Sequence, residues 1–595
     1  MHTGLLRAGL RGSHDGTPHG VIDGSGMGGM TAAAYLAANG RRTLVLEQGD
    51  VLGGNTHVFR RKGYEFEVGV HYLGDCGRPE GNIPTVLRGV GVDKHIEFRE
   101  IDPDGFDVLD FPSVTFKVPR GWKAYGDRLI ETFPDEAPAL RRYLRIIRKL
   151  ADAVDRATTP ASTRGTAAML LRAGWAAPFA IVPLARLLDL CGVGSALRPV
   201  LCGQTPAYAS PADRAPAIVQ AGYLKNYVEG GAYFPIGGGQ VLSATLSEVL
   251  RANDGDFRLN ARVRRIIVEG GRVRGVELDG GEIITAPVVV SNADLKRTYL
   301  ELLDPSAVSP LKRKLVSGYT MAWPLFNTYL GLDIDLSKTM TSSQIWKFRT
   351  DADFGPMRKT VSWAGAGRDR ERWLGILRDN AAAMIHIATN KDQTTALAPA
   401  GHSIIEIMTY LPPDHDLWGL GADGPVDGAK YRDNPEYLAV KDAVTEILID
   451  LAAEVIPNLR DHIVWQEAGT PITQERYTHS TAGGSYGIEM NLRQIGPLRP
   501  TPQDRDQGSL PGRSEPGLGT GRGGRHALRR RRGRCRTRPR SVHRDPQGRG
   551  LRQRGPDPTA RPGLGSPGRR HRYQAARPQS PTRQLTRLTA PLLRR

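Results

Sequence analysis

Six consecutive residues near the start of the chain have the composition of a phosphate-binding turn. Gly24-Ser25-Gly26-Met27-Gly28-Gly29 fits the pattern Gly-x-Gly-x-x-Gly. In such a turn the first glycine permits a tight bend, the second lets backbone N–H groups approach a pyrophosphate, and the third lets the following helix pack close to a sheet. The N-terminus of that helix offers unpaired N–H donors and a partial positive charge to phosphates.

The flanking sequence predicts the elements that must position this turn. A short strand at Val21-Ile22 precedes it, and a helix rich in small residues follows over Met30–Asn39. Thr43–Leu46 reads as a buried strand that ends in Glu47, an acid that can accept hydrogen bonds from both ribose hydroxyls. This strand–helix–strand unit predicts a dinucleotide site, with a chance glycine-rich turn as the alternative. Asp23, directly before the turn, departs from the apolar or small residue expected there.

A second pair of glycines follows the acid. Gly53-Gly54 belongs to the run Gln48-Gly49-Asp50-Val51-Leu52-Gly53-Gly54-Asn55-Thr56-His57. An NAD-binding fold does not need this pair, whereas a flavoprotein uses it to bring backbone against the rest of FAD, because glycine leaves room for close approach. The run favours FAD over an NAD-linked dehydrogenase, which stays the alternative.

The residues that come next carry a resemblance to a known family. Gly63–Gly74 reads Gly-Tyr-Glu-Phe-Glu-Val-Gly-Val-His-Tyr-Leu-Gly, and Thr56–Phe59 precedes it. This run resembles the FAD-dependent phytoene desaturase, carotenoid isomerase and retinol saturase group of amine-oxidase-like flavoproteins, and most of all the retinol saturase branch. Further segments keep the family's order between about residues 20 and 500: Tyr233–Gln240, the strands Phe257–Ile266 and Val273–Leu278 around the hairpin signal Gly270-Gly271, the strand Val288–Ala293 that closes this hairpin unit, and Thr481–Gly487.

The resemblance implies an α/β fold with a Rossmann-like FAD-binding domain of the GR2 type and an inserted α+β substrate cap. We expect the FAD-binding domain in residues 20–75, 225–300 and 468–500, the cap in 76–224 and 301–467, a disordered leader over 1–19 and a disordered basic tail over 501–595. The residues expected to bind FAD are Gly24, Ser25, Gly26, Met27, Gly28, Gly29, Glu47, Gln48, Gly53, Gly54, Asn55, Thr56, Val263 and Asn292.

The implied activity is desaturation, saturation or isomerisation of a conjugated polyene or isoprenoid lipid, by hydride transfer through FAD. The reaction direction, the electron partner and the oligomeric state stay open. Flavin chemistry asks little of side chains, because the cofactor carries the reaction and the protein supplies orientation, electrostatics and exclusion of water. The absence of a Ser/His/Asp or paired-carboxylate pattern is therefore compatible with an enzyme.

Two residues are the candidate catalytic groups. The family motif implies that His71 and Tyr72 lie near the flavin, with a purely structural histidine as the alternative for His71. We expect His57 to be structural, and Ser485 and Tyr486 to serve packing or the phosphate side of the site. The remaining histidines show no metal-ligand spacing, which predicts no metal site.

One apolar stretch is relevant to membrane association. Ala173–Ala185 is 13 residues long, contains Pro178 and Pro183, and is bounded by Arg172 and Arg186. It is too short to span a hydrocarbon core about 30 Å thick, so it forms either a buried helix pair or an interfacial surface where an oily substrate enters. We expect a cytoplasmic protein with reduced cysteines, and peripheral contact with the inner face of the membrane as a further expectation.

The charge of the chain is concentrated at its end. The formal net charge is +19, yet residues 501–595 hold 25 Arg, no Lys and 5 acidic residues, which leaves −1 for the first 500 residues. A tail with so few apolar residues cannot bury enough surface to offset the loss of chain entropy on folding. We therefore expect the tail to be unfolded. Because the body is nearly neutral, we expect no specific nucleic-acid partner for it.

A lost reading frame explains this tail. The family ends with a strand of the kind Lys-Gly-Leu-Tyr-Leu-Ala-Gly, whereas residues 503–512 read Gln-Asp-Arg-Asp-Gln-Gly-Ser-Leu-Pro-Gly. One permitted codon string for this segment, read one base later, gives Lys-Thr-Glu-Ile-Lys-Gly-Leu-Tyr-Leu-Ala. The hypothesis of a frameshift near residue 500 predicts weak FAD retention or none, in a catalytically impaired product. The alternative is an evolved Arg-rich tail that binds nucleic acid or anionic lipid.

Overall fold

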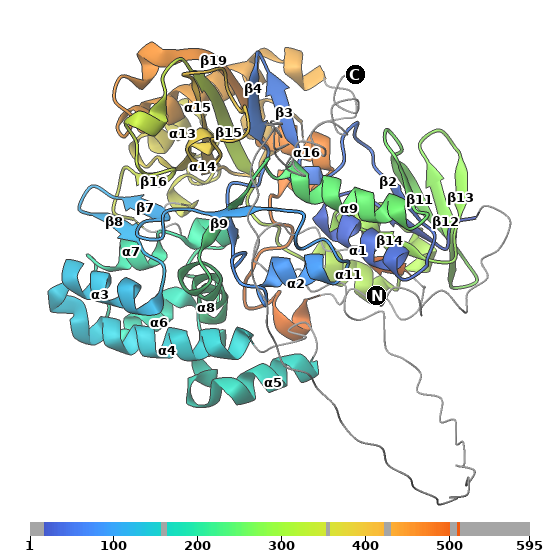
Figure 1. Ribbon diagram of the computed structural model, residues 1–595, viewed down its shortest axis with the longest axis horizontal. Helices are drawn as coiled ribbons and strands as arrows, with labels where there is room; N and C mark the ends of the chain where they lie inside the picture. The colour runs from blue at the N-terminus through green and yellow to red at the C-terminus, as the bar shows by residue number, and fades with distance from the viewer. Residues whose placement is uncertain (1–16, 156–162, 353–357, 422–429, 500–508, 512–595) are drawn as a thin grey trace, which may run out of the picture.

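The computed structural model describes residues 17–155, 163–352, 358–421, 430–499 and 509–511. Most of the expected leader and nearly all of the expected tail lie outside these residues. The described chain has three regions, which are a parallel sheet between two layers, a seven-stranded sheet covered by helices, and a group of helices (Figure 1).

A five-stranded parallel sheet contains the predicted strand–helix–strand unit. Its order is β10-β2-β1-β14-β20. The strands are β1 (Gly20–Asp23), β2 (Thr43–Leu46), β10 (Asp256–Arg258), β14 (Val289–Ser291) and β20 (Ser509–Pro511). The helices α1 (Met27–Ala38) and α9 (Gln240–Ala252) cover one face, where Met30 and Leu246 pack with Ile22 and Val45.

The unit differs from its prediction only at its boundaries. The strand β1 extends to Asp23 beyond the predicted Val21-Ile22, because it pairs along its length with β2 and β14. The helix α1 begins at Met27 rather than Met30, since Gly26 takes the N-cap position. The predicted strand Thr43–Leu46 is confirmed.

The other face of the parallel sheet is covered by a three-stranded antiparallel sheet. It consists of β11 (Val263–Glu269), β12 (Arg272–Leu278) and β13 (Ile283–Thr285), and its Val263, Ile266 and Val276 share a core with Val21 and Val289. The hairpin turn expected between β11 and β12 is confirmed: Gly270 has φ 56° and Gly271 has φ 72°, which suits a tight turn with both central residues left-handed.

Two strand predictions in this part were wrong. Phe257–Ile266 is not one strand, because Asn260 has φ 52° and donates its backbone N–H to Gly49 O at 2.9 Å, so β10 pairs in the parallel sheet while β11 turns into the hairpin sheet. Val288–Ala293 does not close the hairpin unit either. Its strand β14 pairs with β1, and β13 is the third strand of the hairpin sheet.

The seven-stranded sheet is mixed. Its order is β19-β15-β18-β17-β16-β7-β8, and only the β16–β7 pair in it is parallel. The strands are β7 (Asp107–Asp110), β8 (Thr115–Val118), β15 (Leu325–Leu332), β16 (Gln344–Phe348), β17 (Ala382–His386), β18 (Ser403–Tyr410) and β19 (Ile463–Gly469).

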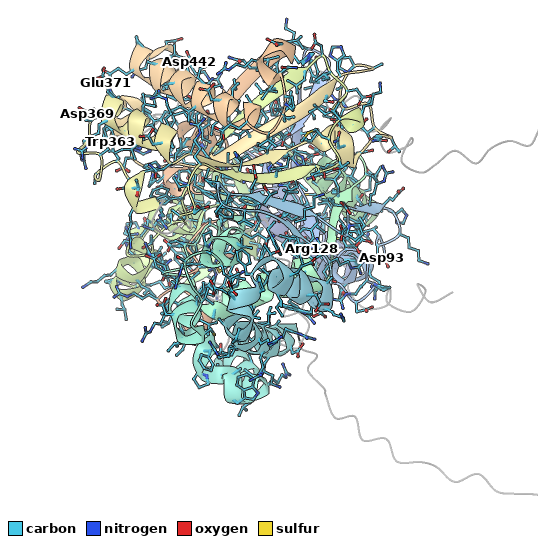
Figure 2. The ribbon with its side chains drawn as sticks, turned by 90° about the vertical axis from the view of Figure 1, so that its left-hand side faces the viewer. Asp93, Arg128, Trp363, Asp369, Glu371 and Asp442 are labelled. Carbon is cyan, nitrogen blue, oxygen red and sulfur yellow. The ribbon has the colours of Figure 1, made fainter. Side chains whose placement is uncertain are left out.

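Both faces of this sheet are covered at its centre. The helices α13 (Arg370–Asp379) and α15 (Pro435–Ala453) pack on one face, and Figure 2 shows their residues Glu371 and Asp442 at the upper end of the molecule. On the other face lies a hairpin of β3 (Val58–Arg61) and β4 (Tyr64–Glu67), whose Phe66 packs with Tyr329 and Ile404. The central strand β18 is consequently buried along its whole length.

A small antiparallel sheet and several short helices join the regions. The sheet consists of β5 (Leu73–Gly74), β9 (Ala232–Pro235) and β6 (Phe98–Glu100). The short helices are α2 (Asn82–Arg88), α10 (Leu295–Arg297), α11 (Pro310–Ser317), α14 (Ala388–Lys391) and α16 (Pro471–Thr478). The last residue of β5 is only seven residues beyond the end of β4, so His71 and Tyr72 lie in a short connection between two sheets.

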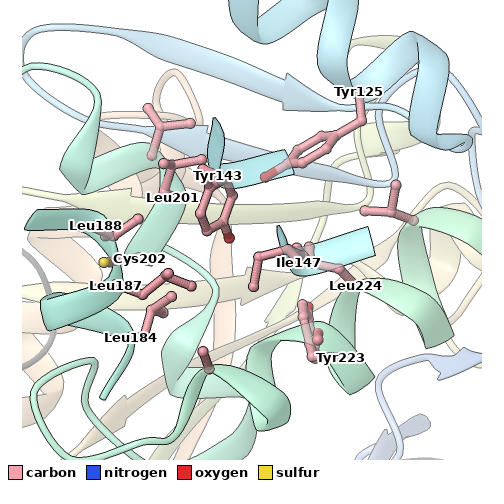
Figure 3. Packing of buried hydrophobic residues seen from close by; sticks show 14 of the residues in the cluster. Tyr125, Tyr143, Ile147, Leu184, Leu187, Leu188, Leu201, Cys202, Tyr223 and Leu224 are labelled. Atoms are coloured by element: carbon pink, nitrogen blue, oxygen red, sulfur yellow. The ribbon is translucent and has the colours of Figure 1, made fainter. Parts of the chain in front are cut away.

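The third region is helical and has its own core. It consists of α3 (Trp122–Thr132), α4 (Ala137–Asp155), α5 (Thr163–Ala173), α6 (Leu184–Cys191), α7 (Arg198–Cys202) and α8 (Ala217–Leu224). Figure 3 shows Tyr143 and Ile147 of α4 packed among Leu184, Leu187 and Leu201. None of the helices in the described ranges is long and apolar enough to cross a bilayer.

Candidate active site

The glycine-rich turn, Glu47 and the second glycine pair form one hydrogen-bonded unit. Ser25 is fully buried and donates its backbone N–H to Glu47 Oε2 at 2.9 Å, and its hydroxyl donates to the same oxygen. Gly53 donates its N–H to Ser25 Oγ at 3.0 Å. Glu47 Oε1 accepts the N–H of Gly49 at 2.8 Å. Residues of two loops that follow adjacent parallel strands are thereby held together.

The glycines make this unit close-packed at the backbone level. A Cβ on Gly29 would lie 2.1 Å from Gly24 O, and one on Gly26 would lie 2.7 Å from Asn292 Nδ2. Gly54 has φ 55°, and its Cβ would lie 3.1 Å from Gly26 Cα. The N-terminus of α1 is therefore closely bordered by the backbone of both glycine loops and by the Asn292 side chain, and side chains on these glycines would close the approach that a pyrophosphate needs.

Two further predicted residues border the same unit. Asn292 follows β14, and its Oδ1 is buried with no hydrogen-bond partner within the described part of the chain, so it can accept from a ligand hydroxyl. Val263 begins β11 two residues after Ala261, whose N–H donates to Glu47 O at 2.8 Å. The residues present thus fit a dinucleotide, with an acid for the ribose, N–H donors for the phosphates and an open acceptor beside the turn.

Other predicted cofactor residues have partners inside the protein. Gln48 Nε2 donates to Tyr477 O at 2.8 Å, and Asn55 Oδ1 accepts from Gln474 Nε2 at 3.2 Å, so both side chains fix α16 to the second glycine loop. The Thr56 hydroxyl donates to Gly53 O at 2.9 Å. These contacts hold the loop in shape, whatever the loop binds.

Asp23 is buried at the end of β1 in front of the turn. It accepts a hydrogen bond from Ser291 Oγ at 3.1 Å. Burial raises the pKa of the Asp23 carboxyl to about 7, against the lowering effect of the Ser291 hydrogen bond and with a further increase from the negative charge of Glu47. At neutral pH this carboxyl is therefore divided between its neutral and charged forms.

The connection that carries His71 and Tyr72 begins against the second glycine loop. A Cβ on Gly69 would lie 3.0 Å from Asn55 O, so the two backbones touch. The Tyr72 hydroxyl donates to Asp107 Oδ2 at 3.1 Å. Burial, with the charge of Asp107 as a second cause, holds the pKa of Tyr72 well above its ordinary value, so Tyr72 keeps its proton.

His71 meets two residues of the seven-stranded sheet that sequence reasoning missed. Its Nδ1 lies 3.0 Å from Glu406 Oε2 at the centre of β18, and its ring centre is 4.8 Å from that of His386 at the end of β17. All three side chains are buried. A signal for Glu406 was present in the sequence, because a lone acid in the apolar run Ser403–Tyr410 must be paired if the strand is buried on both faces.

Lys391 completes the buried group. Its Nζ donates to His71 O at 2.9 Å and to Gln344 Oε1 at 2.5 Å, and lies 2.7 Å from His386 Nδ1. Burial lowers the pKa of Lys391 to about 7, although the carboxylates of Asp107, Glu406 and Glu67 oppose the shift. The buried Lys391 side chain therefore ties the backbone of the expected catalytic segment to the sheet.

The remaining candidates lie apart from this group. His57 Nδ1 lies 2.6 Å from Gly54 O, a contact within its own loop. Ser485 Oγ accepts the N–H of Leu325 at 2.9 Å, and Tyr486 packs against the core of the seven-stranded sheet. The cysteines in the described ranges, Cys76, Cys191 and Cys202, are buried free thiols.

Comparison with known proteins decides the family. A model of the flavin containing amine oxidoreductase family matches residues 27–333. The chain belongs to this family. The family implies FAD as the cofactor. The residues of the glycine-rich unit are those that fit FAD.

Similarity to individual proteins indicates which branch of the family the chain resembles. Human all-trans-retinol 13,14-reductase is 27% identical over 501 residues, which cover 80% of this flavoprotein and 78% of the relative. The chloroplastic prolycopene isomerase of Daucus carota is 25% identical over 483 residues, 78% of this chain and 71% of the relative. The expected kinship with retinol saturases and with carotenoid isomerases and desaturases is confirmed, and the chain is a flavin-dependent oxidoreductase of that group.

Solved structures confirm the α/β fold. Putrescine oxidase with bound putrescine superimposes with a TM-score of 0.54 at 14% identity, over 85% of this chain and 96% of that one. At that identity the likeness concerns the fold alone. The flavoprotein thus has the flavin amine-oxidase fold, while its closer sequence relatives act in retinoid and carotenoid chemistry by their names.

Proposed function

We propose that this flavoprotein is an FAD-dependent oxidoreductase that acts on a conjugated polyene or isoprenoid lipid. The observation that carries the proposal is the continuous path from the dinucleotide unit to a buried polar group. Ser25, Glu47 and Gly53 are joined by hydrogen bonds, and the chain passes from that loop to His71. The names of the relatives support the substrate class, since retinol and prolycopene are both conjugated isoprenoids.

In this proposal the residues divide the cofactor between them. The N-terminus of α1 holds the pyrophosphate, Glu47 accepts from the ribose hydroxyls, and the backbone of Gly53 and Gly54 approaches the remainder of FAD. Bound FAD supplies the hydride acceptor for desaturation or the hydride donor for saturation. Val263 and Asn292 border the same cofactor from the hairpin sheet and from β14.

His71 and Tyr72 orient the reacting end of the site. Their segment is fixed from behind by Lys391, which bonds to His71 O, and by Asp107, which accepts from the Tyr72 hydroxyl. Because a flavin site works by position and by exclusion of water, a segment so fixed suits it. In this proposal residues 76–224 and 301–467 form the cap that encloses the substrate.

An anionic membrane surface is the proposed source of the oily substrate. The segment from α5 through α6 exposes large apolar side chains, namely Leu171 (82% exposed), Trp175 (55%), Ile181 (62%) and Leu190 (53%). Their neighbours Arg172 and Arg186 are exposed as well, and residues 163–191 contain one acid, Asp189. An exposed Trp among aliphatic residues with flanking Arg suits the interface of an anionic bilayer.

Flavin content and turnover test the proposed function. The chain and a form with the reading frame restored from residue 503 are purified, and bound flavin and activity on a panel of retinoids and carotenes are measured. We expect flavin and turnover in the restored form. Absence of both from the restored form would contradict the proposal. Turnover that requires NAD⁺ and no flavin would favour a nicotinamide-linked dehydrogenase instead.

The Arg-rich tail supports one competing function. Its 25 Arg residues would let the 595-residue product bind polyanions without catalysis. DNA binding that weakens steeply with salt, together with a restored form that neither holds flavin nor turns over, would favour this impaired remnant.

Vesicle sedimentation tests the membrane surface. In the form with the reading frame restored, which lacks the Arg-rich tail, the variant W175S/I181S is compared with L311S/L315S, which removes two apolar side chains exposed on α11. We expect the first variant to lose binding to phosphatidylglycerol vesicles and the second to keep it. Equal binding by both variants would rule this surface out.

A further inference from the structure

Three buried side chains from distant parts of the chain converge on one point. His71, His386 and Glu406 each offer a nitrogen or oxygen atom, and these atoms all lie within 4.8 Å of one another. Glu406 Oε2 is 3.0 Å from His71 Nδ1 and 3.9 Å from His386 Nε2. None of these three atoms has an aligned hydrogen-bond partner among the described residues. Buried polar atoms are normally paired, so three such atoms at one point require an explanation.

A large ligand does not explain these three unpaired atoms. His386 and Glu406 have no exposed surface, and only the rim residue His71 keeps a small exposed fraction. A flavin ring or a polyene therefore cannot reach the point between the three side chains. An ion or a proton can occupy it.

Fixed groups stand behind two of these side chains. Glu406 Oε1 accepts the backbone N–H of Glu67 at 2.8 Å, and His386 Nδ1 lies 2.7 Å from Lys391 Nζ and 3.2 Å from Gln344 Oε1. A histidine that binds a metal through one ring nitrogen usually donates from the other to a fixed acceptor, and ligating carboxylates are likewise hydrogen-bonded. Nε2 of His386 and Oε2 of Glu406 are the atoms left over, and these face His71.

Buried carboxyl groups lie around this point. Glu67, Asp107 and Glu406 are all buried close to Lys391. Isolated negative charges in a protein interior are costly unless they are paired or bind a metal. A divalent cation between His71, His386 and Glu406 would give the Glu406 carboxylate a direct partner.

We propose that His71, His386 and Glu406 bind one divalent transition-metal ion, with Zn²⁺ as the best match. Two imidazoles and one carboxylate are a donor set that Zn²⁺ accepts, with a fourth position left for water or another ligand. The ion joins the segment that leads from the dinucleotide unit to the end of β17 and to the middle of β18. Ligand spacing could not predict it, since 315 residues separate His71 from His386.

Metal binding to the full chain tests the site. The purified protein is stripped with a chelator and titrated with Co²⁺ as a visible probe, and Zn²⁺ retained after dialysis is measured by elemental analysis. We expect one equivalent of either metal. Glu406→Gln and His386→Gln should weaken binding by more than the roughly 10- to 100-fold that loss of an outer partner costs.

A matched pair elsewhere provides the control. His415 Nε2 lies 2.7 Å from Glu475 Oε2, so His415→Gln removes a histidine paired with a glutamate and should leave metal binding unchanged. His71→Gln, at the more accessible rim, gives a second test if the core variants fail to fold. Absence of bound metal in the wild type, or equal binding by wild type and the variants at His71 and Glu406, overturns the proposal. Because metal content is read without flavin or substrate, this result stands apart from the proposed function.

Discussion

Asp23 and Ser291 end two neighbouring parallel strands, and the Ser291 hydroxyl donates to Asp23 Oδ2 at 3.1 Å. The pair lies directly before the glycine-rich turn, where the sheet meets the proposed phosphate site. Burial raises the pKa of Asp23 to about 7. The folded chain thus holds a proton near neutrality that the unfolded chain has released.

Asp23→Asn should stabilise the protein at alkaline pH. The pKa of the Asp23 carboxyl is higher in the folded chain than in the unfolded chain, so ionisation of this group destabilises the native state. The free energy of unfolding therefore falls as pH rises from about 4, and the full loss is present above about 7. The amide removes this cost, which amounts to at most about 4 kcal/mol for a rise of this size. Urea unfolding of both forms between pH 5 and 9 measures the difference.

The gain should disappear at low pH, where Asp23 is protonated in both states. Asp442, exposed on α15 and visible in Figure 2, provides the control, and Asp442→Asn should change stability little at any pH. A gain from Asp23→Asn that is the same at pH 5 and pH 9 would show that the carboxyl carries its charge without cost.

Gly29→Ala should damage both the fold and the cofactor site. The new methyl group would meet Gly24 O at 2.1 Å and must push α1 away from the turn, at a cost of about 2–3 kcal/mol. Gly375 lies inside α13 with open space around it, so Gly375→Ala should stabilise by roughly 0.5–1 kcal/mol. Melting temperatures and flavin content of the two variants provide the comparison, and equal melting temperatures would contradict the close packing at Gly29.

The sequence predicted the dinucleotide unit well because its signals are local. Gly24, Gly26 and Glu47 act within one strand–helix–strand unit, where spacing along the chain fixes spacing in the fold. Asn260 was missed as a break, since the alternation of apolar and polar residues in Phe257–Ile266 continues through this left-handed residue. Lys391 and Glu406 were missed for a different reason: they reach His71 only through the pairing order of the seven-stranded sheet, which one sequence does not reveal.

Substitutions in α5 and α6 should change the free energy of unfolding strongly at buried positions and little at exposed ones. Leu184 is fully buried in the helical core shown in Figure 3, so Leu184→Ala should cost roughly 2–5 kcal/mol. Leu171→Ala removes an exposed side chain and should change stability by less than about 0.5 kcal/mol. Similar losses in urea unfolding for both variants would mean that Leu171 is covered in solution.

The edge of the parallel sheet bears on the frameshift hypothesis. Ser509–Pro511 forms β20 and pairs with Val289–Ser291 of β14 as the fifth strand. The permitted codon string, read one base later, encodes Leu-Tyr-Leu at this place, and these residues favour a strand more than Ser-Leu-Pro does. Pro511 also lacks the N–H that a strand partner needs, so it suits an edge but cannot be followed by another strand on that side.

Peptide mass spectrometry on the protein from its native source should therefore detect Gly-Leu-Tyr-Leu-Ala after residue 507, and no peptides from 513–595. A restored strand of that sequence would bury apolar side chains against β14 and strengthen the wall of the proposed FAD site, so the native protein should be yellow and should keep its flavin through gel filtration. Arg-rich peptides such as those expected from 526–545, found together with an intact coding frame, would refute the hypothesis. The tail would then be a genuine part of the protein, and its 25 Arg residues would need a polyanionic partner.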